Sequence, residues 1–303
     1  MTGVAALAYI GLSVRDPDRW QEFGAEVLGM QPVPPSGDKG VRYLRMDKRA
    51  WRIMVEKGNP GLSVIGLEVA DDSTLAALCV KLEAAGHSVK IMPELAKERS
   101  VHQLARVEDP EGNVVELVTS PRSTYLPFVS RFGIRFVTGN MGLGHLVLGC
   151  EDFDASQRFY LDELGFKISD RIGGTTFTRT NARHHTVGLG PVGGWRRKGL
   201  GHFMVQVEDI DMVGAALDRV ATGGGTLQKT LGRHTNDQMI SFYAFGPEGI
   251  RLEFGCGAQT VDPEWWVGAY DRPSVWGHHV LVPSSDQPAA EPGLSTLIQS
   301  EPS

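Results

Sequence analysis

The sequence predicts an α+β fold in which four repeated βαβββ modules are paired into two similar domains. Three observations support this prediction: a high glycine content, a duplication that spans most of the chain, and a shorter repeat within each half. Glycine makes up 37 of the 303 residues, about 12%, whereas roughly 7% is usual. Such a composition favours tight turns and therefore many short strands. The length is sufficient for two ordinary domains.

The duplication is visible when residues 8–30 are placed over residues 144–166, an offset of 136. Leucine, aspartate, phenylalanine and glycine positions then coincide without a gap. A second stretch, "DPEGNVVEL" at 109–117, matches "GPEGIRLEFG" at 246–255 with an offset of 137. An offset that is constant to within one residue indicates a tandem duplication.

Each half divides again into two modules, and each module is expected to contain a strand, a helix and three further strands. Aspartate and serine cap free N–H groups at a helix start, and glycine tolerates the left-handed residue past a helix end. The four expected starts lie near Asp18, Ser73, Asp154 and Asp209. The three expected closing glycines are Gly29, Gly86 and Gly165. The fourth helix is expected to end less clearly, around residues 221–225. Short β-rich runs separated by polar turns follow each helix.

Three strands of the second half each carry one polar side chain on the face opposite their apolar residues. Successive side chains alternate between the two faces of a strand. In "GIRLEF" the three apolar residues therefore share one face, and Glu253 lies on the other. The same alternation in "GHLVLG" and "GHFMVQV" turns His145 and His202 away from their apolar neighbours.

The first half provides an internal control for these three residues. Tyr9 occupies the place of His145, Val64 lies near that of His202, and only the carboxylate is retained, as Glu116. A single histidine in a strand is more often an ordinary residue than a ligand, but a requirement of the fold would appear in both halves. The set therefore indicates a functional site. Glu116 is expected to be a relic that makes ordinary hydrogen bonds.

Two histidines and one carboxylate form the facial triad that holds non-haem Fe(II) and leaves coordination positions open. A structural site would instead use four protein ligands. The sequence therefore predicts a catalytic Fe(II) site, for which Mn(II) is not excluded. The nearby stretches "NARHHTVGLG" (181–190) and "GRHTNDQMISFY" (232–243) supply groups that can carry protons or bind an oxyanion. Without the triad, these stretches would be equally consistent with surface loops.

Several motifs combine into a recognisable pattern: "GLGH", "NARHHT", "GHFMVQVED", "LGRHTND", "SFYAFGPEG", and "EFG" followed by "TVD". With "RAWRI" at 49–53 and "WGH" at 276–278, they resemble the type I extradiol ring-cleaving dioxygenases of the vicinal oxygen chelate superfamily, most closely the 2,3-dihydroxybiphenyl 1,2-dioxygenases. The likeness covers residues 1 to about 280. It implies a metal-free domain at 1–125, a linker at 126–141 and a catalytic domain at 142–283. Each domain would be a partly open β-barrel with helices outside.

The resemblance also implies the roles of individual residues. The implied metal ligands are His145, His202 and Glu253. The implied catalytic and substrate-binding residues are His185, His234, Asp237 and Tyr243. His185 would be the acid/base residue near O₂, a choice that strand alternation leaves open between it and His184. His234 and Tyr243 would contact the catechol oxygens, and Asp237 would support His234.

The implied activity inserts both atoms of O₂ into a catechol and opens the ring to a hydroxy-oxo-dienoic acid during degradation of aromatic compounds. The expected substrate is bicyclic, of the 2,3-dihydroxybiphenyl type. Two features depart from the family pattern. The segment at 171–180 is short, and Gly201 stands where another histidine often precedes His202. Because the short segment borders the substrate pocket in the family, the identity of the ring system is left open.

Two alternative functions remain open from the sequence. A glyoxalase-like isomerase could use the same fold, although such enzymes usually need further protein ligands. A protein that only binds an aromatic ligand would have no need for His185, His234 and Tyr243 beside a metal site. The partners expected of the enzyme are a catechol and O₂, and family members often assemble into homo-oligomers.

Charge and cysteine usage limit the other partners and the location. The net charge of -6 argues against nucleic acid or an anionic membrane as partner. The basic cluster at 195–198 is interpreted as a solvated loop. Three distant cysteines and the absence of an apolar run of roughly 18 residues favour a soluble protein in the reducing cytoplasm. The start reads as a strand rather than a signal peptide. The Pro/Ser-rich stretch at 284–303 is expected to be disordered.

Overall fold

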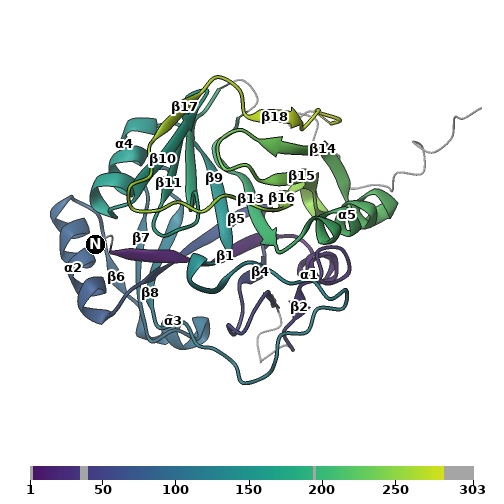
Figure 1. Ribbon diagram of the computed structural model, residues 1–303. Coiled ribbons are helices and arrows are strands. Elements are labelled where there is room, and N and C mark those ends of the chain that lie inside the picture. Colours follow the sequence, from purple (N-terminus) through teal and green to yellow (C-terminus); the bar gives the residue numbers. More distant parts are fainter. Residues whose placement is uncertain (1–2, 35–39, 194–195, 283–303) are drawn as a thin grey trace, which may run out of the picture.

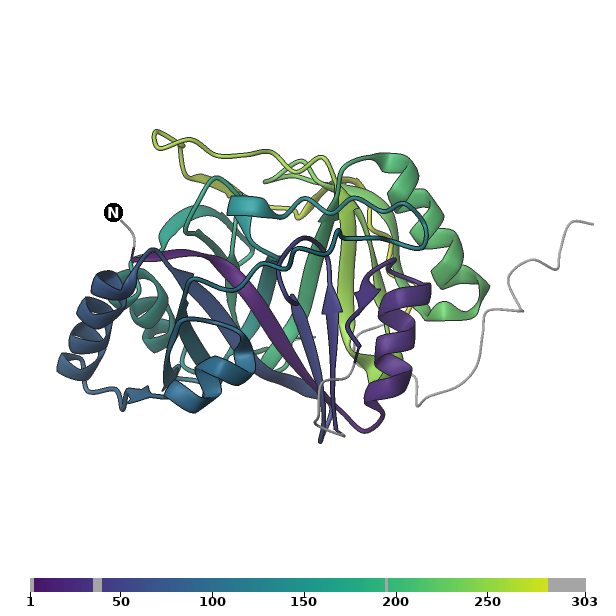
Figure 2. The same cartoon turned by 90° about the horizontal axis from the view of Figure 1, so that it is seen from below.

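The computed structural model describes residues 3–34, 40–193 and 196–282, which form two large sheets with helices at their sides. The stretch at 284–303 that was expected to be disordered lies outside these residues. Figures 1 and 2 show the helices α2 and α4 gathered at one side of the molecule and α1 and α5 at the other. The elements follow the predicted βαβββ order four times.

Two modules form the first half. The first contains β1 (Val4–Val14), α1 (Pro17–Glu26), β2 (Gln31–Pro32), β3 (Val41–Arg45) and β4 (Ile53–Lys57). The second contains β5 (Gly61–Val69), α2 (Asp72–Ala84), β6 (Lys90–Ile91), α3 (Pro93–Arg99), β7 (Gln103–Glu108) and β8 (Val114–Thr119). Their strands join into one sheet in the order β2-β3-β4-β1-β5-β8-β7-β6. The short helix α3 is an addition that the repeat did not predict.

The second half repeats this arrangement after the short turn η1 (Gly139–Met141). Its first module contains β9 (Gly144–Cys150), α4 (Phe153–Gln157), η2 (Arg158–Glu163), β10 (Lys167–Ile172), β11 (Thr175–Arg179) and β12 (Val187–Pro191). Its second contains β13 (Gly199–Val207), α5 (Ile210–Arg219), η3 (Val220–Gly224), β14 (Thr226–His234), β15 (Ile240–Phe245), η4 (Pro247–Gly249) and β16 (Arg251–Cys256). The sheet order is β17-β10-β11-β12-β9-β13-β16-β15-β14-β18. The edge strands β17 (Gly268–Tyr270) and β18 (Ser274–Gly277) extend the repeat.

An aspartate side chain caps the start of the first long helix in every module. The four caps are Asp16, Asp71, Asp152 and Asp209. Three helices therefore begin slightly earlier than predicted, because the capping residue is the aspartate two positions before the expected start. Gly29, Gly86 and Gly165 have positive φ angles of 74°, 94° and 81°, as expected of residues that follow a helix end.

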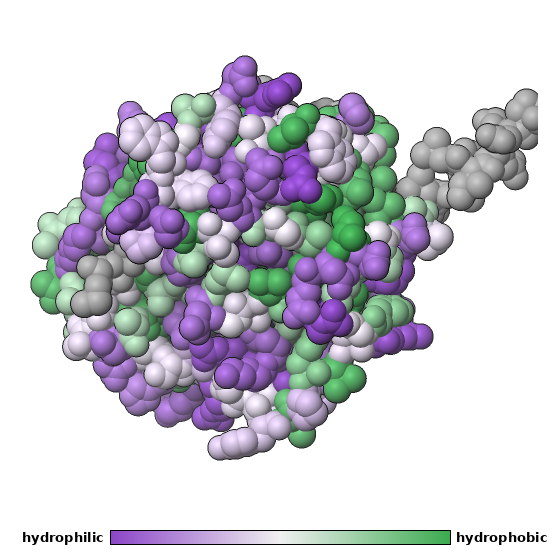
Figure 3. Space-filling model, in the orientation of Figure 1, coloured by the Kyte–Doolittle hydropathy of each residue, from purple (hydrophilic) through white to green (hydrophobic). Residues whose placement is uncertain are grey.

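A shared apolar cluster joins the two halves. Trp20 of α1 lies against Phe203 of β13, with ring centroids 6.1 Å apart, and its indole nitrogen donates to the carbonyl of Pro247. The surface in Figure 3 has hydrophilic and hydrophobic residues interspersed. Among the described residues, no helix is long and apolar enough to cross a membrane. All three cysteines are free and buried.

Candidate metal and substrate site

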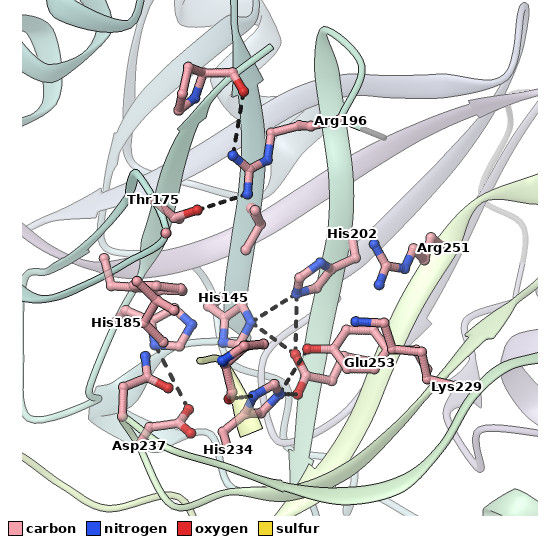
Figure 4. Close-up of a pocket in the computed structure, with 18 of the residues that line it drawn as sticks. His145, Thr175, His185, Arg196, His202, Lys229, His234, Asp237, Arg251 and Glu253 are labelled. Atoms are coloured by element: carbon pink, nitrogen blue, oxygen red, sulfur yellow. Dashed lines mark hydrogen bonds and ion pairs between the residues drawn. The ribbon is translucent and has the colours of Figure 1, made fainter. Parts of the chain in front are cut away.

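His145, His202 and Glu253 meet inside the second sheet because they lie on three adjacent strands, β9, β13 and β16. Each Nε2 of the two histidines lies near Glu253 Oε2, at 3.3 Å from His145 and 3.2 Å from His202. The two Nε2 atoms are 3.3 Å apart. All three side chains are buried, with 2%, 7% and 1% of their residue surfaces exposed. Three donor atoms thus converge on one point of the interior (Figure 4).

The spacing and chemistry of this set fit a divalent cation. Ligands that are bound at roughly 2.1 Å and at right angles to one another lie about 3 Å apart, which is close to the distances observed here. Two neutral imidazoles and one carboxylate form the donor set preferred by non-haem Fe(II). These residues were predicted as ligands from strand alternation, and the fold brings all three together.

Glu253 is kept ionised although it is buried. Burial raises the pKa of its carboxyl group, but the charge on His234 and hydrogen bonds from the surrounding histidines outweigh burial and hold the pKa well below its usual range. Its Oε1 atom accepts from Ser241 Oγ at 2.6 Å and lies 3.0 Å from His234 Nε2. The carboxylate is therefore available as a ligand near neutral pH.

His234 and Tyr243 form a pair at the edge of this group. His234 Nδ1 lies 3.0 Å from the Pro273 carbonyl oxygen, to which only an N–H can donate. Its Nε2 lies 2.9 Å from the Tyr243 hydroxyl. Burial lowers the pKa of His234, but the charge of Glu253 outweighs it and raises the value to about 9. Burial and Glu253 raise the pKa of Tyr243 well above its usual range, so that its hydroxyl remains a donor.

His185 lies at the end of a buried chain of three polar side chains. His184 Nε2 lies 2.8 Å from Asp170 Oδ2, and His184 Nδ1 lies 3.0 Å from His185 Nδ1. When His184 Nε2–H donates to the carboxylate, its Nδ1 must accept, and His185 then donates from Nδ1. We therefore assign His185 as the tautomer with a free lone pair on Nε2. Burial, then the neighbouring His145, lowers its pKa well below the ordinary value, which keeps the ring neutral.

Asp237 lies beside His185 as well as in the neighbourhood of His234. Its Oδ2 atom is 3.9 Å from His185 Nδ1, and its Oδ1 accepts from the backbone N–H of Met239 at 3.1 Å. Its charge contributes to the raised pKa of His234. The fold thus places this carboxylate where it can favour the Nδ1–H tautomer of His185, a contact that the sequence did not predict.

One cavity of about 500 Å³, a size typical of small-molecule sites, is lined by His145, His202 and Glu253 together with His185, His234, Asp237 and Tyr243. The short segment at 171–180 borders the cavity through Ile172, Thr175 and Phe177. Phe177 also lies edge-on to His185, with ring centroids 4.8 Å apart. The segment that departed from the family pattern therefore shapes the space around the reacting groups.

Three cations of the cavity wall, Arg196, Lys229 and Arg251, were not identified from the sequence. The basic cluster at 195–198 was interpreted as a solvated loop, and for Arg196 this was wrong. Its guanidinium turns inward, is partly buried, and donates to Thr175 Oγ1 at 2.8 Å. Strand alternation could have found Arg251, because it lies two residues before Glu253 on the same face of β16. For Lys229 and Asp170 the sequence offers no comparable signal.

The corresponding place in the first half is filled. In the second half, His145 and Glu253 are both paired with Met204 on the strand between them. In the first half, Tyr9 and Glu116 are paired in the same way with Gly66, so that they occupy the equivalent positions. The Tyr9 hydroxyl donates to Glu116 Oε2 at 2.6 Å.

Glu116 is fully buried and forms ion pairs with two arginines. The distances are 3.2 Å to Arg99 and 2.6 Å to Arg106. Glu116 thus makes the hydrogen bonds expected of it, and two of them are also ion pairs, one with the largely buried Arg99.

Comparisons with known proteins agree with this architecture. A family model described as the Glyoxalase/Bleomycin resistance protein/Dioxygenase superfamily matches residues 142–254. A second model, described as Dihydroxybiphenyl dioxygenase BphC D1, matches residues 7–58. Both halves of the chain are thus matched by models with related descriptions.

Similar proteins extend over almost the whole chain. The biphenyl-2,3-diol 1,2-dioxygenase of Paraburkholderia xenovorans (strain LB400) is 38% identical, covering 91% of this chain and 95% of its own. The iron-dependent extradiol dioxygenase of Rhodococcus jostii (strain RHA1) is 36% identical over 92% of this chain and 98% of its own. The crystal structure of BphC, a halotolerant catechol dioxygenase, superposes with a TM-score of 0.88 at 33% identity, over 96% of this chain and 98% of that one.

Proposed function

This chain belongs to the extradiol dioxygenases of the Glyoxalase/Bleomycin resistance protein/Dioxygenase superfamily, and from that membership we propose that it is an Fe(II)-dependent enzyme that cleaves a substituted catechol beside its two hydroxyl groups. Both atoms of O₂ enter the product, a hydroxy-oxo-dienoic acid. The observation that carries the proposal is the convergence of His145, His202 and Glu253 in one half of a duplicated fold.

His145, His202 and Glu253 hold the iron. When bound, Fe(II) supplies open coordination positions at which a catecholate and O₂ meet, and it stabilises the charge that develops on them. A set of three protein ligands suits this task, because a fourth would occupy a position that the reactants need.

The surrounding side chains bind the catechol and manage its protons. The Tyr243 hydroxyl and the His234 imidazole lie 2.9 Å apart and present two donors to the catechol oxygens. The buried, neutral His185 has a free Nε2 lone pair, so that it can accept a proton and return it as the ring opens. General acid and base catalysis of this kind typically contributes roughly 10²- to 10⁴-fold.

The cavity favours a catechol larger than the unsubstituted ring. Its volume of about 500 Å³ leaves space beyond the metal ligands, bordered by Ile172, Phe177 and Val192. Relatives named biphenyl-2,3-diol 1,2-dioxygenase support a bicyclic substrate of that type.

We also propose that residues 1–125 and 142–283 are separate domains joined by 126–141, and that the protein is a cytoplasmic homo-oligomer.

O₂ consumption tests the proposed activity. The protein, reconstituted with Fe(II) under anaerobic conditions, should consume O₂ with 2,3-dihydroxybiphenyl, and little without metal. Reconstitution with Mn(II) in parallel identifies the active metal. The proposal would be rejected if the Fe(II)-loaded protein consumed no more O₂ than the metal-free protein with 2,3-dihydroxybiphenyl, 1,2-dihydroxynaphthalene or catechol. That outcome would favour an isomerase or a binding protein. A higher kcat/KM for catechol than for the two bicyclic compounds would reject the bicyclic preference alone.

A further inference from the structure

The proposed chemistry leaves a group of cations in the cavity wall without a role. They are Arg196, Lys229 and Arg251, which we call the cationic wall. In Figure 4 Arg196 lies above the metal ligands and Lys229 and Arg251 lie to their right, whereas His185 and Asp237 lie on the other side. The cations therefore face a part of the cavity that is distinct from the proton-transfer side.

Two of these cations gather over one aromatic ring. The Lys229 ammonium lies 4.8 Å and the Arg251 guanidinium carbon 4.7 Å from the centre of the Tyr243 ring. Two like charges that lie against the same ring in a partly buried site repel one another, and the ring offsets only part of this cost. Such an arrangement is expected where an anion completes the charge balance.

Arg196 is accommodated by the backbone opposite it. A side chain at Gly190 would place a Cβ atom 2.1 Å from Arg196 Nη1, so the glycine leaves the space that the guanidinium occupies. Thr175 Oγ1 and the Pro191 carbonyl accept from the guanidinium at 2.8 and 3.4 Å. The inward position of Arg196 is thus stabilised by two hydrogen bonds and depends on the absence of a side chain at Gly190.

The carboxylates of the cavity form their ion pairs with groups other than Lys229. Glu253 forms its ion pairs with His145, His202 and His234. Asp237 approaches His185, and Asp271 is exposed at the rim. Within the described ranges, no carboxylate lies at ion-pair distance from the Lys229 ammonium.

We propose that the catechol cleaved by this enzyme carries an anionic substituent, a carboxylate, which the cationic wall binds. This inference rests on the proposed ring-cleaving function and narrows its substrate class. A carboxylate is the ligand that matches an arginine fork and an ammonium group in the wall of one cavity. The apolar residues of the wall then contact the part of the substrate that joins the ring to the carboxylate.

The test compares two substrates that differ only in charge. They are 3-(2,3-dihydroxyphenyl)propanoate and its primary amide, which have nearly the same shape. The wild-type enzyme should have a kcat/KM about tenfold or more higher for the carboxylate, because charge-assisted hydrogen bonds are stronger than neutral ones. In Lys229→Met the preference for the carboxylate over the amide, measured as the ratio of their kcat/KM values, should fall to a few-fold. Lys229→Arg should restore most of this preference. Added salt should lower the wild-type ratio.

Controls separate this inference from other roles of the same lysine. Lys167→Met removes an exposed charge outside the cavity and should keep the wild-type ratio. If Lys229→Met does not fold, Arg196→Gln provides the same comparison. Equal kcat/KM values for the two substrates in the wild type would overturn the inference. An equal loss for both substrates in Lys229→Met would also overturn it, because the lysine would then act on the catecholate itself.

Anaerobic calorimetry with the same pair of compounds provides a readout independent of turnover. Tighter binding of the carboxylate, weakened in Lys229→Met, supports the inference even if no catechol is cleaved. Equal affinities reject it whether or not ring cleavage is observed. Failure of the proposed function and failure of this inference are therefore distinguishable.

Discussion

The Tyr9 hydroxyl donates a 2.6 Å hydrogen bond to Glu116, at the place where His145 faces Glu253 in the second half. The two carboxylates occupy equivalent positions of a duplicated strand pair but have different partners. Glu253 is surrounded by imidazoles, which can share a metal with it. Glu116 instead accepts a hydrogen bond from a phenol and forms ion pairs with two arginines.

The first prediction compares the two carboxylates. Glu253→Gln should lose iron and activity, because the site would lose its only charged ligand. Glu116→Gln should keep both, but it should lower the free energy of unfolding by about 3 kcal/mol, since it leaves buried arginine charge uncompensated. Iron per chain, turnover and denaturant unfolding of the two variants provide the measurements. Loss of iron from folded Glu116→Gln would place the active metal elsewhere.

The second prediction concerns His185, which lines the cavity but is not among the three converging ligands. His185→Gln should retain near wild-type iron while kcat falls by about 10²-fold or more, because glutamine cannot exchange the proton. Metal analysis and steady-state kinetics on the same preparation test this. An iron-free variant would show that His185 is a ligand.

The third prediction concerns Asp170, which acts on His185 only through His184. Asp170→Asn removes the carboxylate charge that favours the Nε2–H tautomer of His184, so kcat should fall by about 10- to 100-fold with iron retained. The pH dependence of kcat should also shift, which a purely structural defect would not cause. Asp271→Asn, at the exposed rim of the cavity, is the matched control. An unchanged kcat and pH profile in Asp170→Asn would mean that another group orients His185.

The fourth prediction concerns pH and His278. This side chain is 7% exposed, and its Nε2 lies 3.0 Å from the Ser241 carbonyl oxygen. Burial, then the charge of His234, lowers its pKa from 6.5 to about 4. At pH values between about 4 and 6.5, His278 binds a proton in the unfolded chain but not in the folded protein. The free energy of unfolding therefore falls as the pH falls through this range.

Between pH 6.5 and 4, His278 should therefore cost the metal-free protein up to about 3 kcal/mol. Urea unfolding along this pH range measures the effect. His278→Asn should reduce the dependence, to which the buried His185 also contributes, and asparagine tolerates the φ of 53° at this position. His279→Asn, at the exposed neighbour, should leave it unchanged. A dependence that is unchanged in His278→Asn would assign the whole effect to other buried groups.

Much of the architecture follows from local sequence signals. Capping aspartates and closing glycines mark the helices, and period-2 alternation places His145, His202 and Glu253 on one inner face. The duplication then separates function from fold, because a residue needed only for packing recurs in both halves. These signals depend on neighbours in the chain, which a single sequence displays directly.

The remaining features depend on contacts between distant segments. From the sequence, Arg196 is predicted to be a solvated loop residue, because the contacts that turn it inward involve other segments. Its acceptor Thr175 lies on β11, and the space for its side chain is left by Gly190 on β12. Asp170 becomes part of the site only through His184, on a different segment. The ion pair between Glu116 and Arg99 likewise requires α3, a helix that the repeat does not contain.

The filled interior of the first half fixes the binding stoichiometry of each chain. Tyr9, Trp51 and Met54 pack where an equivalent pocket would open, and the Tyr9 and Trp51 ring centroids are 4.3 Å apart. A duplicated chain could have carried two equivalent sites, whose occupancy within one chain would be coupled. We therefore expect one catechol to saturate each chain and the saturation curve of a single chain to be hyperbolic. Any sigmoidal response to substrate must therefore originate between chains.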